Sequence, residues 1–359
     1  MDEFARRLVG DRRAFIEEAA SRRDVTPIVI EKDFWVCWTL RRLTAMSGLE
    51  NHVTFKGGTS LSKAYGLIQR FSEDIDLTIR RDAPLIDAVA PPMEDGISGK
   101  ERERRTKALK AAAQAYVATV TMPALTAAIE NALGTANGWT VALDPEDKDR
   151  QTLLFSYPQT SGWGLNYGMG YGGKAGTGYI KPRIKLEYGA RGEPEPFEDC
   201  VIVPYLAYDF PAELPDAKTI VPTLSVVRTF WEKATILHAL CHKGGLRNGL
   251  SRHYYDLVML DRAGVTADAL AQPELLAAVV RNKSLMFTDK AASYETAVIG
   301  RLRLFEASMT EALAGDYDAM ADMFMAAPPS LSALVEALGD LERRLNGPAA
   351  QTHLGSAAP

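Results

Sequence analysis

The sequence predicts an α+β fold, in which a mixed sheet with flanking helices is followed by a C-terminal helical bundle. Residues 55–79 read as the end of a strand, a Gly-Gly-Thr turn, a helix and a second strand. From about Pro222 the apolar residues instead recur at helical spacing. The chain has 359 residues, 47% of them hydrophobic, so it is long enough to bury a sizeable core in about two domains.

We expect a first domain at residues 1–215, a helical domain at 216–346 and a flexible tail at 347–359. The first domain would contain an inserted helix at about 95–135 and a glycine-dense loop at 161–178. This loop lacks the Gly-Lys-Ser/Thr ending of a phosphate-binding loop, and strand-like runs flank it. We therefore interpret it as a mobile hairpin loop.

The Gly-Gly-Thr turn is a candidate anion site. Gly57 and Gly58 supply the backbone freedom of a tight turn, which leaves amide groups available to a ligand. Thr59 is placed to begin a helix of about three turns, whose apolar positions extend to Ile68. The turn would then lie at the positive N-terminal end of a helix, where a triphosphate can bind.

The strand after this helix carries two aspartates. Period-2 alternation puts Asp74 and Asp76 on one face, roughly 7 Å apart, with apolar residues on the other face. Two such carboxylates can share Mg²⁺ or Mn²⁺. Glu187, on a later strand, is a candidate third carboxylate. A simple surface face of Lys185 and Glu187 explains that strand equally well.

Each motif alone has an ordinary explanation, because most Gly-Gly-Thr sequences are turns and most Asp-x-Asp strands present a solvated face. Packing alone seldom produces both in this order and at this spacing. We therefore interpret the segment as the catalytic core of a nucleotidyltransferase that uses a nucleoside triphosphate (NTP). We also assign Lys63 and Arg70, two cations near this core, to nucleotide binding.

A lysine stands out in the helical segment that follows residue 223. On a helical wheel Lys233 lies in the middle of a broad apolar arc, whereas Arg228 and Thr235 fall on the face expected to be exposed. A lysine in such a place needs a partner or a route to the surface. The alternative is that Lys233 reaches a nucleotide phosphate.

Basic residues crowd the start of the expected inserted helix. Arg102, Arg104 and Arg105 belong to a run in which glutamates are interleaved, and Arg183 lies on a later strand. Such a run is either a solvated helix face or a surface that contacts RNA phosphates. The formal net charge of −5 argues against indiscriminate nucleic-acid binding but leaves room for a local basic face.

The sequence predicts a cytoplasmic protein without a membrane partner. No stretch reads as long enough to span a membrane, and the N-terminal charges are not followed by the apolar region of a signal peptide. Three scattered cysteines argue against a disulfide framework or a zinc cluster.

Four segments in order, FKGGTSLSKAY, RFSEDIDL, RTFWEKATILH and SRHYYDL, resemble the AbiEii/AbiGii-type nucleotidyltransferase toxins. This branch of the DNA-polymerase-β-like superfamily includes the MenT toxins. The resemblance implies a polymerase-β-like sheet and assigns Gly58 and Thr59 to the nucleotide-binding turn. It also assigns roles in catalysis to four residues: the metal-binding Asp74 and Asp76, the essential Lys233, and Asp256 of the last motif.

The same resemblance implies a toxin of an abortive-infection or toxin–antitoxin system. Characterised relatives add nucleotides to tRNA, and others are described as binding an NTP. We therefore expect Mg²⁺-dependent transfer of nucleotides from an NTP to RNA, most simply the tRNA 3′ end, and a cognate antitoxin as a further partner. Two alternatives remain: an antibiotic-type transferase that modifies a small molecule, and a nucleotide-binding protein without turnover.

Overall fold

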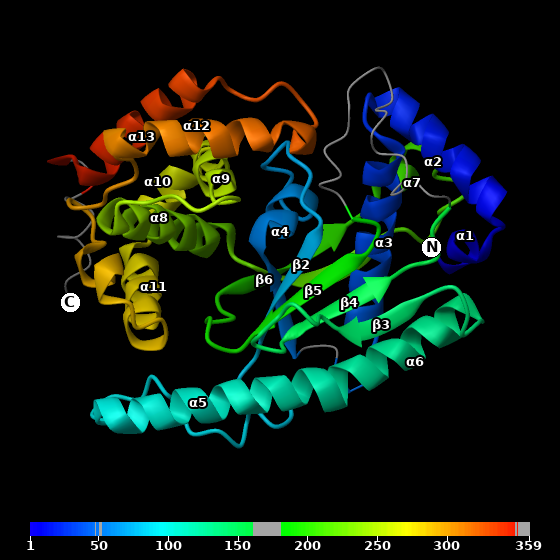
Figure 1. The fold of residues 1–359 in the computed structure, drawn as a ribbon, viewed down its shortest axis with the longest axis horizontal. Helices are drawn as coiled ribbons and strands as arrows, with labels where there is room; N and C mark the ends of the chain where they lie inside the picture. Colours follow the sequence, from blue (N-terminus) through cyan, green and yellow to red (C-terminus); the bar gives the residue numbers. More distant parts are fainter. Residues whose placement is uncertain (47, 50–51, 161–180, 349, 351–359) are drawn as a thin grey trace. The chain divides into compact units, whose positions relative to one another are not determined.

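The computed structural model describes residues 1–46, 48–49, 52–160, 181–348 and 350 (Figure 1). The glycine-dense loop expected at 161–178 and most of the tail expected at 347–359 lie outside the described residues. The chain divides into two compact units, which we describe separately. The first unit consists of Met1–Ala64, Phe71–Pro91 and Ile97–Thr223, and the second consists of Tyr65–Arg70, Pro92–Gly96 and the chain from Leu224 onward.

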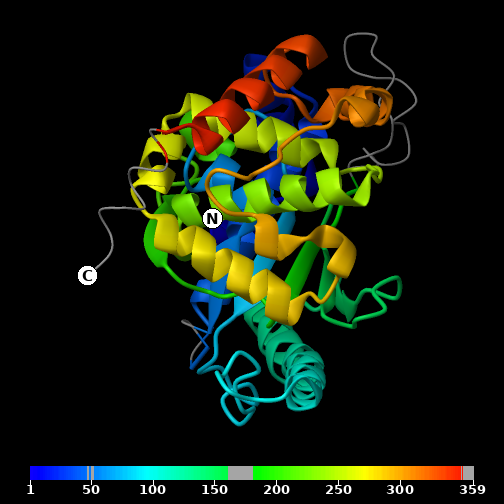
Figure 2. The same cartoon turned by 90° about the vertical axis from the view of Figure 1, so that its left-hand side faces the viewer.

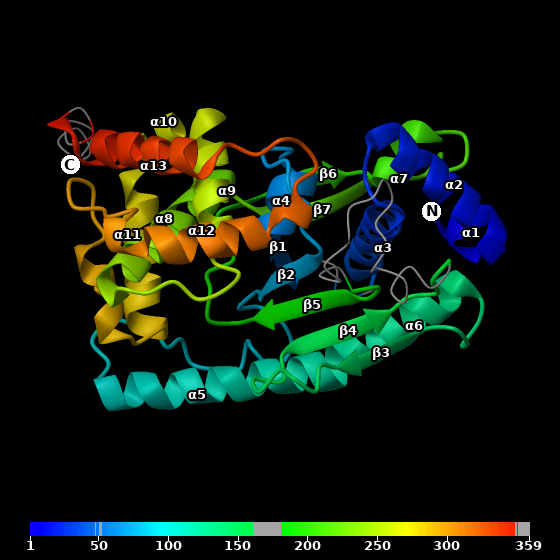
Figure 3. The same ribbon diagram turned by 45° about the horizontal axis from the view of Figure 1, so that its top comes forward.

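The first unit is built on a mixed sheet with the strand order β3-β4-β5-β2-β1-β7-β6. Strand β2 pairs antiparallel with β1 and parallel with β5, and β4 pairs antiparallel with both β3 and β5. Figure 3 shows β3, β4 and β5 side by side. The strands are β1 (Val53–Lys56), β2 (Asp74–Ile79), β3 (Thr140–Leu143), β4 (Thr152–Ser156), β5 (Ile184–Gly189), β6 (Phe197–Ile202) and β7 (Thr219–Leu224).

The sheet confirms the predicted mixed α/β character and moves the expected boundary between the two parts of the chain. Strand β7 pairs parallel with β1 through Phe55 and Thr223, so the sheet extends past residue 215. Two short segments, 65–70 and 92–96, join the second unit although the sequence places them within the first.

Helices pack around this sheet, most of them N-terminal to its central strands or inserted after β2. They are α1 (Asp2–Arg6), α2 (Val9–Arg23), α3 (Pro27–Thr44), α4 (Gly57–Lys63), α5 (Gly99–Ala115), α6 (Met122–Leu133) and α7 (Tyr205–Asp209). Helix α3 packs against β2 and β5. Its Trp35 and Trp38 are buried and contact the rings of Phe155 and Tyr157, so apolar burial fixes α3 on one face of the sheet.

Helices α5 and α6 form one continuous helix because a π-helical segment, Tyr116–Thr121, joins them (Figure 1). The segment ends just before Pro123, which has no backbone N–H and whose ring would collide with the carbonyl group four residues earlier. Widening the helix to a π turn accommodates the proline without breaking it. The resulting helix, Gly99–Leu133, occupies the region in which the sequence predicts an inserted helix.

This helix corrects the expectation that no stretch reaches membrane-spanning length. By length and composition alone Gly99–Leu133 could cross a bilayer, and it is the one such helix among the described residues. A single helix of this kind is weak evidence, because helices of soluble proteins can pass the same test.

The second unit is mostly helical (Figure 2). Helix α8 contacts α9, α10 and α11, while α9 also contacts α12 and α13. Their bounds are α8 (Val226–Lys243), α9 (Ser251–Arg262), α10 (Val265–Leu270), α11 (Pro273–Met286), α12 (Thr310–Ala319) and α13 (Leu331–Asn346). Arg228 and Thr235 of α8 are buried, so the expectation that these two residues are exposed is wrong; α8 packs against neighbouring helices.

Candidate functional site

Strand β2 presents its two aspartates on the face predicted from its alternation. Asp74 and Asp76 are half-buried, whereas Ile75, Leu77 and Ile79 are buried on the opposite face. Because apolar burial on one face fixes the strand's orientation, the carboxylates are held on the other. The strand therefore presents two oxygen-donor side chains two residues apart.

The glycine turn and the Asp76 carboxylate are in contact. Gly57 has a φ of +82°, and a Cβ atom added to it would lie 1.9 Å from Asp76 Oδ2. Any other residue here would both adopt a left-handed backbone and collide with the carboxylate. The combination proposed from the sequence, a glycine turn beside an aspartate pair, is thus brought together within the first unit.

The helix that follows the turn is shorter than the sequence predicts. Helix α4 begins at Gly57 and ends at Lys63, so Ile68 is not part of it. Gly66 has a φ of +66°, a left-handed conformation that the helix cannot continue through. The N–H groups of the first turn of α4, beginning at Gly57 and Gly58, have no partner within the helix.

Thr59 has a positioning role in the structure. Its hydroxyl group donates a hydrogen bond to the Asp74 carbonyl oxygen at 2.5 Å and lies 3.0 Å from the Ser72 hydroxyl. The side chain is buried. Thr59 therefore fixes the start of β2 to the glycine turn, and its contribution to a nucleotide site would come through its backbone N–H.

Glu187 is the nearest candidate for a third carboxylate. The β2–β5 register places it directly beside Asp76, and it places Lys185 beside Asp74. Glu187 Oε1 also forms a 2.5 Å ion pair with Lys185, so Glu187 fits both interpretations of this strand face, a third carboxylate and a surface ion pair. Among the described residues no three Asp, Glu, His or Cys side chains are grouped as metal ligands.

Lys63, which the sequence assigns to nucleotide binding, lies in a buried ion pair. Its ammonium group lies 2.7 Å from Asp33 Oδ1, and both side chains are almost fully buried. It also lies 3.7 Å from the centre of the Tyr205 ring. The ion pair joins α4 to α3, and a role of Lys63 in nucleotide binding stays a prediction.

One residue near the acidic strand that the sequence analysis missed is Lys32. Lys32 of α3 is buried and donates to Glu73 Oε2 at 2.5 Å and to the Lys181 carbonyl oxygen at 2.8 Å. Burial lowers the pKa of Lys32, although the attraction of Glu73 and Asp74 opposes this effect. Lys32 therefore brings positive charge close to Asp74, and no local sequence pattern reveals it because it comes from a distant helix.

A second missed residue is Lys56, the last residue of β1. The antiparallel register pairs it directly with Asp76. Such pairs have neighbouring side chains on the same face of a sheet. Its place between the strand and the glycine turn is the signal that sequence reasoning had available but did not use.

The second unit contains a buried charge cluster of Arg70, Lys233 and Asp256. Arg70 donates to both carboxylate oxygens of Asp256, at 2.7 and 2.8 Å, and Lys233 donates to Oδ2 at 2.7 Å. The exposed fractions of the three residues are 1%, 5% and 0%. The lysine predicted to need a partner has one, and two cations share a single buried anion.

The pKa shifts in this cluster follow from its two cations and one anion. Burial by itself raises the pKa of Asp256, but attraction to Arg70 and Lys233 and their hydrogen bonds outweigh it and hold the pKa below its ordinary value. Burial lowers the pKa of Lys233, and Asp256 only partly restores it. The cluster carries a formal charge of +1, which an anionic ligand would neutralise.

The basic run on α5 is largely balanced by its own glutamates. Arg104 and Arg105 both bind Glu101, and Arg105 also donates to the Pro91 carbonyl oxygen. Hydrogen bonds from these two arginines lower the pKa of Glu101 to about 2. The arrangement has the pairing of a solvated helix face, although exposed pairs of this kind are weak enough for a phosphate to displace.

Arg183, the remaining candidate for contact with RNA, belongs to the first unit but is not part of α5. It is half-buried and close enough to Lys32 and Glu73 to influence the pKa of both. Its charge therefore acts near the start of β2. The described residues give it no link to the basic run on α5.

Comparison with known proteins identifies the family to which these features belong. The model of the nucleotidyl transferase AbiEii toxin family, described as a type IV toxin–antitoxin system, matches residues 38–342. This range covers most of the chain and contains the glycine turn, the aspartate pair and the buried cluster. The chain belongs to the AbiEii nucleotidyltransferase toxin family, and it is accordingly a nucleotidyltransferase.

Among solved structures the chain is similar to MenT4, a nucleotidyltransferase toxin from Mycobacterium tuberculosis H37Rv. The two share 17% sequence identity over 97% of this chain and 99% of that one, with a TM-score of 0.39. The family match, rather than this likeness, carries the assignment. A search of curated proteins found no match.

Proposed function

We propose that this toxin transfers nucleotides from an NTP to RNA in a metal-dependent reaction, with the tRNA 3′ end as the acceptor. The observation that supports it best is the contact between the glycine turn and Asp76, which places a carboxylate beside backbone N–H groups suited to phosphate. A metal ion and a triphosphate require this combination of donors and acceptors.

Asp74 and Asp76 would hold Mg²⁺ or Mn²⁺. Mg²⁺ usually binds one or two carboxylates and takes its other ligands from water and substrate phosphates, so two aspartates on one strand face suit it. When bound, the ion would offset charge on the phosphates and on the acceptor oxygen. Glu187, beside Asp76, is a candidate to orient this pair or to supply a further oxygen.

The backbone N–H groups at Gly57, Gly58 and Thr59 would hydrogen-bond to phosphate oxygens. In that place they would stabilise the negative charge that develops on the leaving pyrophosphate, without a rearrangement of the backbone. Lys32, buried close to Asp74, would keep the start of β2 in place while the charge of the site changes.

Lys233 and Arg70 would bind a nucleotide phosphate through the cationic cluster of the second unit. The support is that two buried cations share one carboxylate, an arrangement that favours an anion and costs stability without one. Asp256 would orient both cations. The bidentate geometry of Arg70 makes its guanidinium the more firmly fixed of the two.

Membership of a type IV toxin–antitoxin family supports a cognate antitoxin as a partner. RNA as the acceptor rests on the resemblance of the four sequence segments to toxins whose characterised relatives modify tRNA. A small-molecule acceptor is the second candidate, and the internal pairing of the basic run on α5 favours it, because that run is not an unopposed basic surface. A nucleotide-binding protein without turnover is the least compatible with an intact aspartate pair.

The acceptor can be identified by following a labelled nucleotide. Purified protein would be incubated with α-³²P-labelled NTPs, Mg²⁺, total tRNA and a cytoplasmic small-molecule fraction. We expect the label in the RNA fraction, at the 3′ end. Label in the small-molecule fraction alone would support the second candidate and reject RNA as the substrate.

A further inference from the structure

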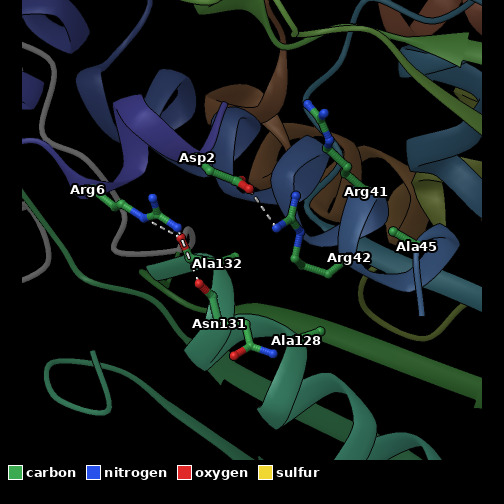
Figure 4. A pocket seen from close by; sticks show the side chains of 8 residues that line it. All are labelled: Asp2, Arg6, Arg41, Arg42, Ala45, Ala128, Asn131 and Ala132. Atoms are coloured by element: carbon green, nitrogen blue, oxygen red, sulfur yellow. Dashed lines mark hydrogen bonds and ion pairs between the residues drawn. The ribbon is translucent and has the colours of Figure 1, made fainter. Parts of the chain in front are cut away.

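A cavity of about 530 Å³ lies at the opposite end of α3 from the residues discussed above. It is lined by Asp2 and Arg6 of α1, Arg41 and Arg42 of α3, Asn131 of α6 and three alanines (Figure 4). Lys32, which pairs beside the acidic strand, is ten residues before Arg42, or roughly 15 Å along the helix axis. The cavity is therefore a separate place within the first unit.

The charges that line this cavity are unbalanced. Three arginines face one carboxylate, which gives the lining a formal charge of +2. Asp2 is already engaged, since it accepts hydrogen bonds from Trp38 Nε1 and from Arg42, each at 2.9 Å. Arg41 binds Asp216 outside the lining. The remaining positive charge favours an anion over a neutral or a cationic ligand.

One buried donor in the lining has no partner. Arg42 is 9% exposed, and its Nε has no hydrogen-bond acceptor within the described part of the chain. A buried N–H group without an acceptor is costly. This Nε has almost no accessible surface, so a ligand in the cavity would approach the terminal nitrogen atoms of the guanidinium rather than Nε. The Arg42 guanidinium also lies 4.8 Å from the centre of the Trp38 ring, which together with Asp2 fixes its plane.

The opposite side of the cavity is equally well fixed. Arg6 donates from Nε to the Ala132 carbonyl oxygen at 2.7 Å and from a terminal nitrogen to the Asn131 carbonyl oxygen at 3.3 Å. These bonds anchor Arg6 to the last turn of α6, so that Arg6 and Arg42 enter the cavity from opposite sides (Figure 4). The three alanines of the lining have small side chains, which leave room for a ligand.

We propose that this cavity binds a phosphate monoester, held between the guanidinium groups of Arg6 and Arg42 and the side-chain amide of Asn131. At neutral pH such a group carries a charge of about −1.5 to −2 and has three acceptor oxygens, which suits the positive charge of the lining. Arginine forks are the side chains best suited to this geometry. The ligand is a small phosphate-bearing molecule or free phosphate.

Asn131→Asp is the variant that tests this proposal. Asn131 is exposed, so the change should not affect folding, but it adds a negative charge to the cavity at unchanged volume. Asn137→Asp is the matched control, because Asn137 is also exposed and lies outside the lining. Calorimetric titrations would use inorganic phosphate, adenosine 5′-monophosphate and adenosine.

Inorganic phosphate or the monophosphate should bind the wild type and Asn137→Asp equally, and Asn131→Asp at least tenfold more weakly. Arg6→Gln should weaken binding as well. Tighter binding of the monophosphate than of phosphate would identify a nucleotide as the ligand, and equal binding would identify the phosphate group alone; both results support the site. Unchanged affinity in Asn131→Asp, no phosphate binding to the wild type, or equally tight binding of adenosine would overturn it. Because no turnover is measured, the result is independent of nucleotidyl transfer.

Discussion

Replacing Gly57 by alanine should destabilise the first unit and displace the Asp76 carboxylate. Two costs add. A residue with a side chain at a φ of +82° costs about 1–2 kcal/mol in backbone strain. The new methyl group would lie 1.9 Å from Asp76 Oδ2 and 2.7 Å from its Cγ, and relieving such overpacking costs about 1–3 kcal/mol. We therefore expect a total loss of about 2–5 kcal/mol.

Gly138→Ala separates these two costs. Gly138 has a similar φ of +85°, but no neighbouring heavy atom lies within 4 Å of the position of its Cβ. It should pay the backbone cost alone, about 1–2 kcal/mol. Urea unfolding gives the free energy of unfolding of both variants, and we expect Gly57→Ala to be less stable than Gly138→Ala by at least about 1 kcal/mol.

The clash with Asp76 can be tested directly by a double-mutant cycle. In an Asp76→Ala background Gly57→Ala should lose most of its extra cost, because the atoms it collides with are gone. Equal destabilisation by Gly57→Ala and Gly138→Ala, or a cycle without coupling, would refute the contact between turn and carboxylate. Gly57→Ala should also lose nucleotidyl transfer, which Gly138→Ala should retain.

Three further predictions concern charged groups. Asp256→Asn should lower the free energy of unfolding in urea by about 3–5 kcal/mol, because it leaves two buried cations without a counter-ion. Lys233→Met should match or exceed wild-type stability and lose transfer. Equal changes in stability for the two variants would contradict the shared-anion cluster. Burial raises the pKa of Glu31 to about 7, so the folded protein should lose about 3 kcal/mol of stability between pH 4.5 and 7, and Glu31→Gln should remove this slope. If α5 binds RNA, Arg104→Gln should lower the salt dependence of RNA binding by about one unit, whereas Arg343→Gln, at another exposed arginine paired with an acid three residues away, should not.

The sign of the Glu31 effect follows from its surroundings. Desolvation raises its pKa more than the hydrogen bond from the Thr160 N–H and the charges of Arg12 and Arg13 lower it. The folded state thus holds the proton more tightly than the unfolded state, and stability falls as pH rises through this range. A flat difference between Glu31→Gln and the wild type from pH 4.5 to 8 would contradict this account.

The sequence predicted those features that depend on short-range patterns. The alternation in β2 was sufficient to place Asp74 and Asp76 on one face, and the glycine pair located the turn beside them. The apolar arc of α8 identified Lys233 as a residue in need of a partner. Each of these follows from periodicity or backbone conformation, which a few neighbouring residues determine.

The features that the sequence did not reveal depend on contacts between distant residues. Lys63 pairs with Asp33 on another helix, and Arg70 pairs with Asp256, which is 186 residues away. No local pattern distinguishes a lysine that faces a ligand from one that faces a buried carboxylate. The exposure expected for two residues of α8 was wrong for the same reason, since α8 packs against helices later in the chain.

The central claim, that the Asp74–Asp76 face and the glycine turn form the transfer site, is tested most directly by Asp76→Asn. This change keeps the shape of the side chain and removes its charge, so the fold should be retained. With α-³²P-labelled NTP and Mg²⁺, the wild type should label its acceptor, and Asp76→Asn should lose at least a hundredfold in rate while its urea unfolding curve shows no loss of stability. Undiminished labelling by a correctly folded Asp76→Asn protein would contradict the account.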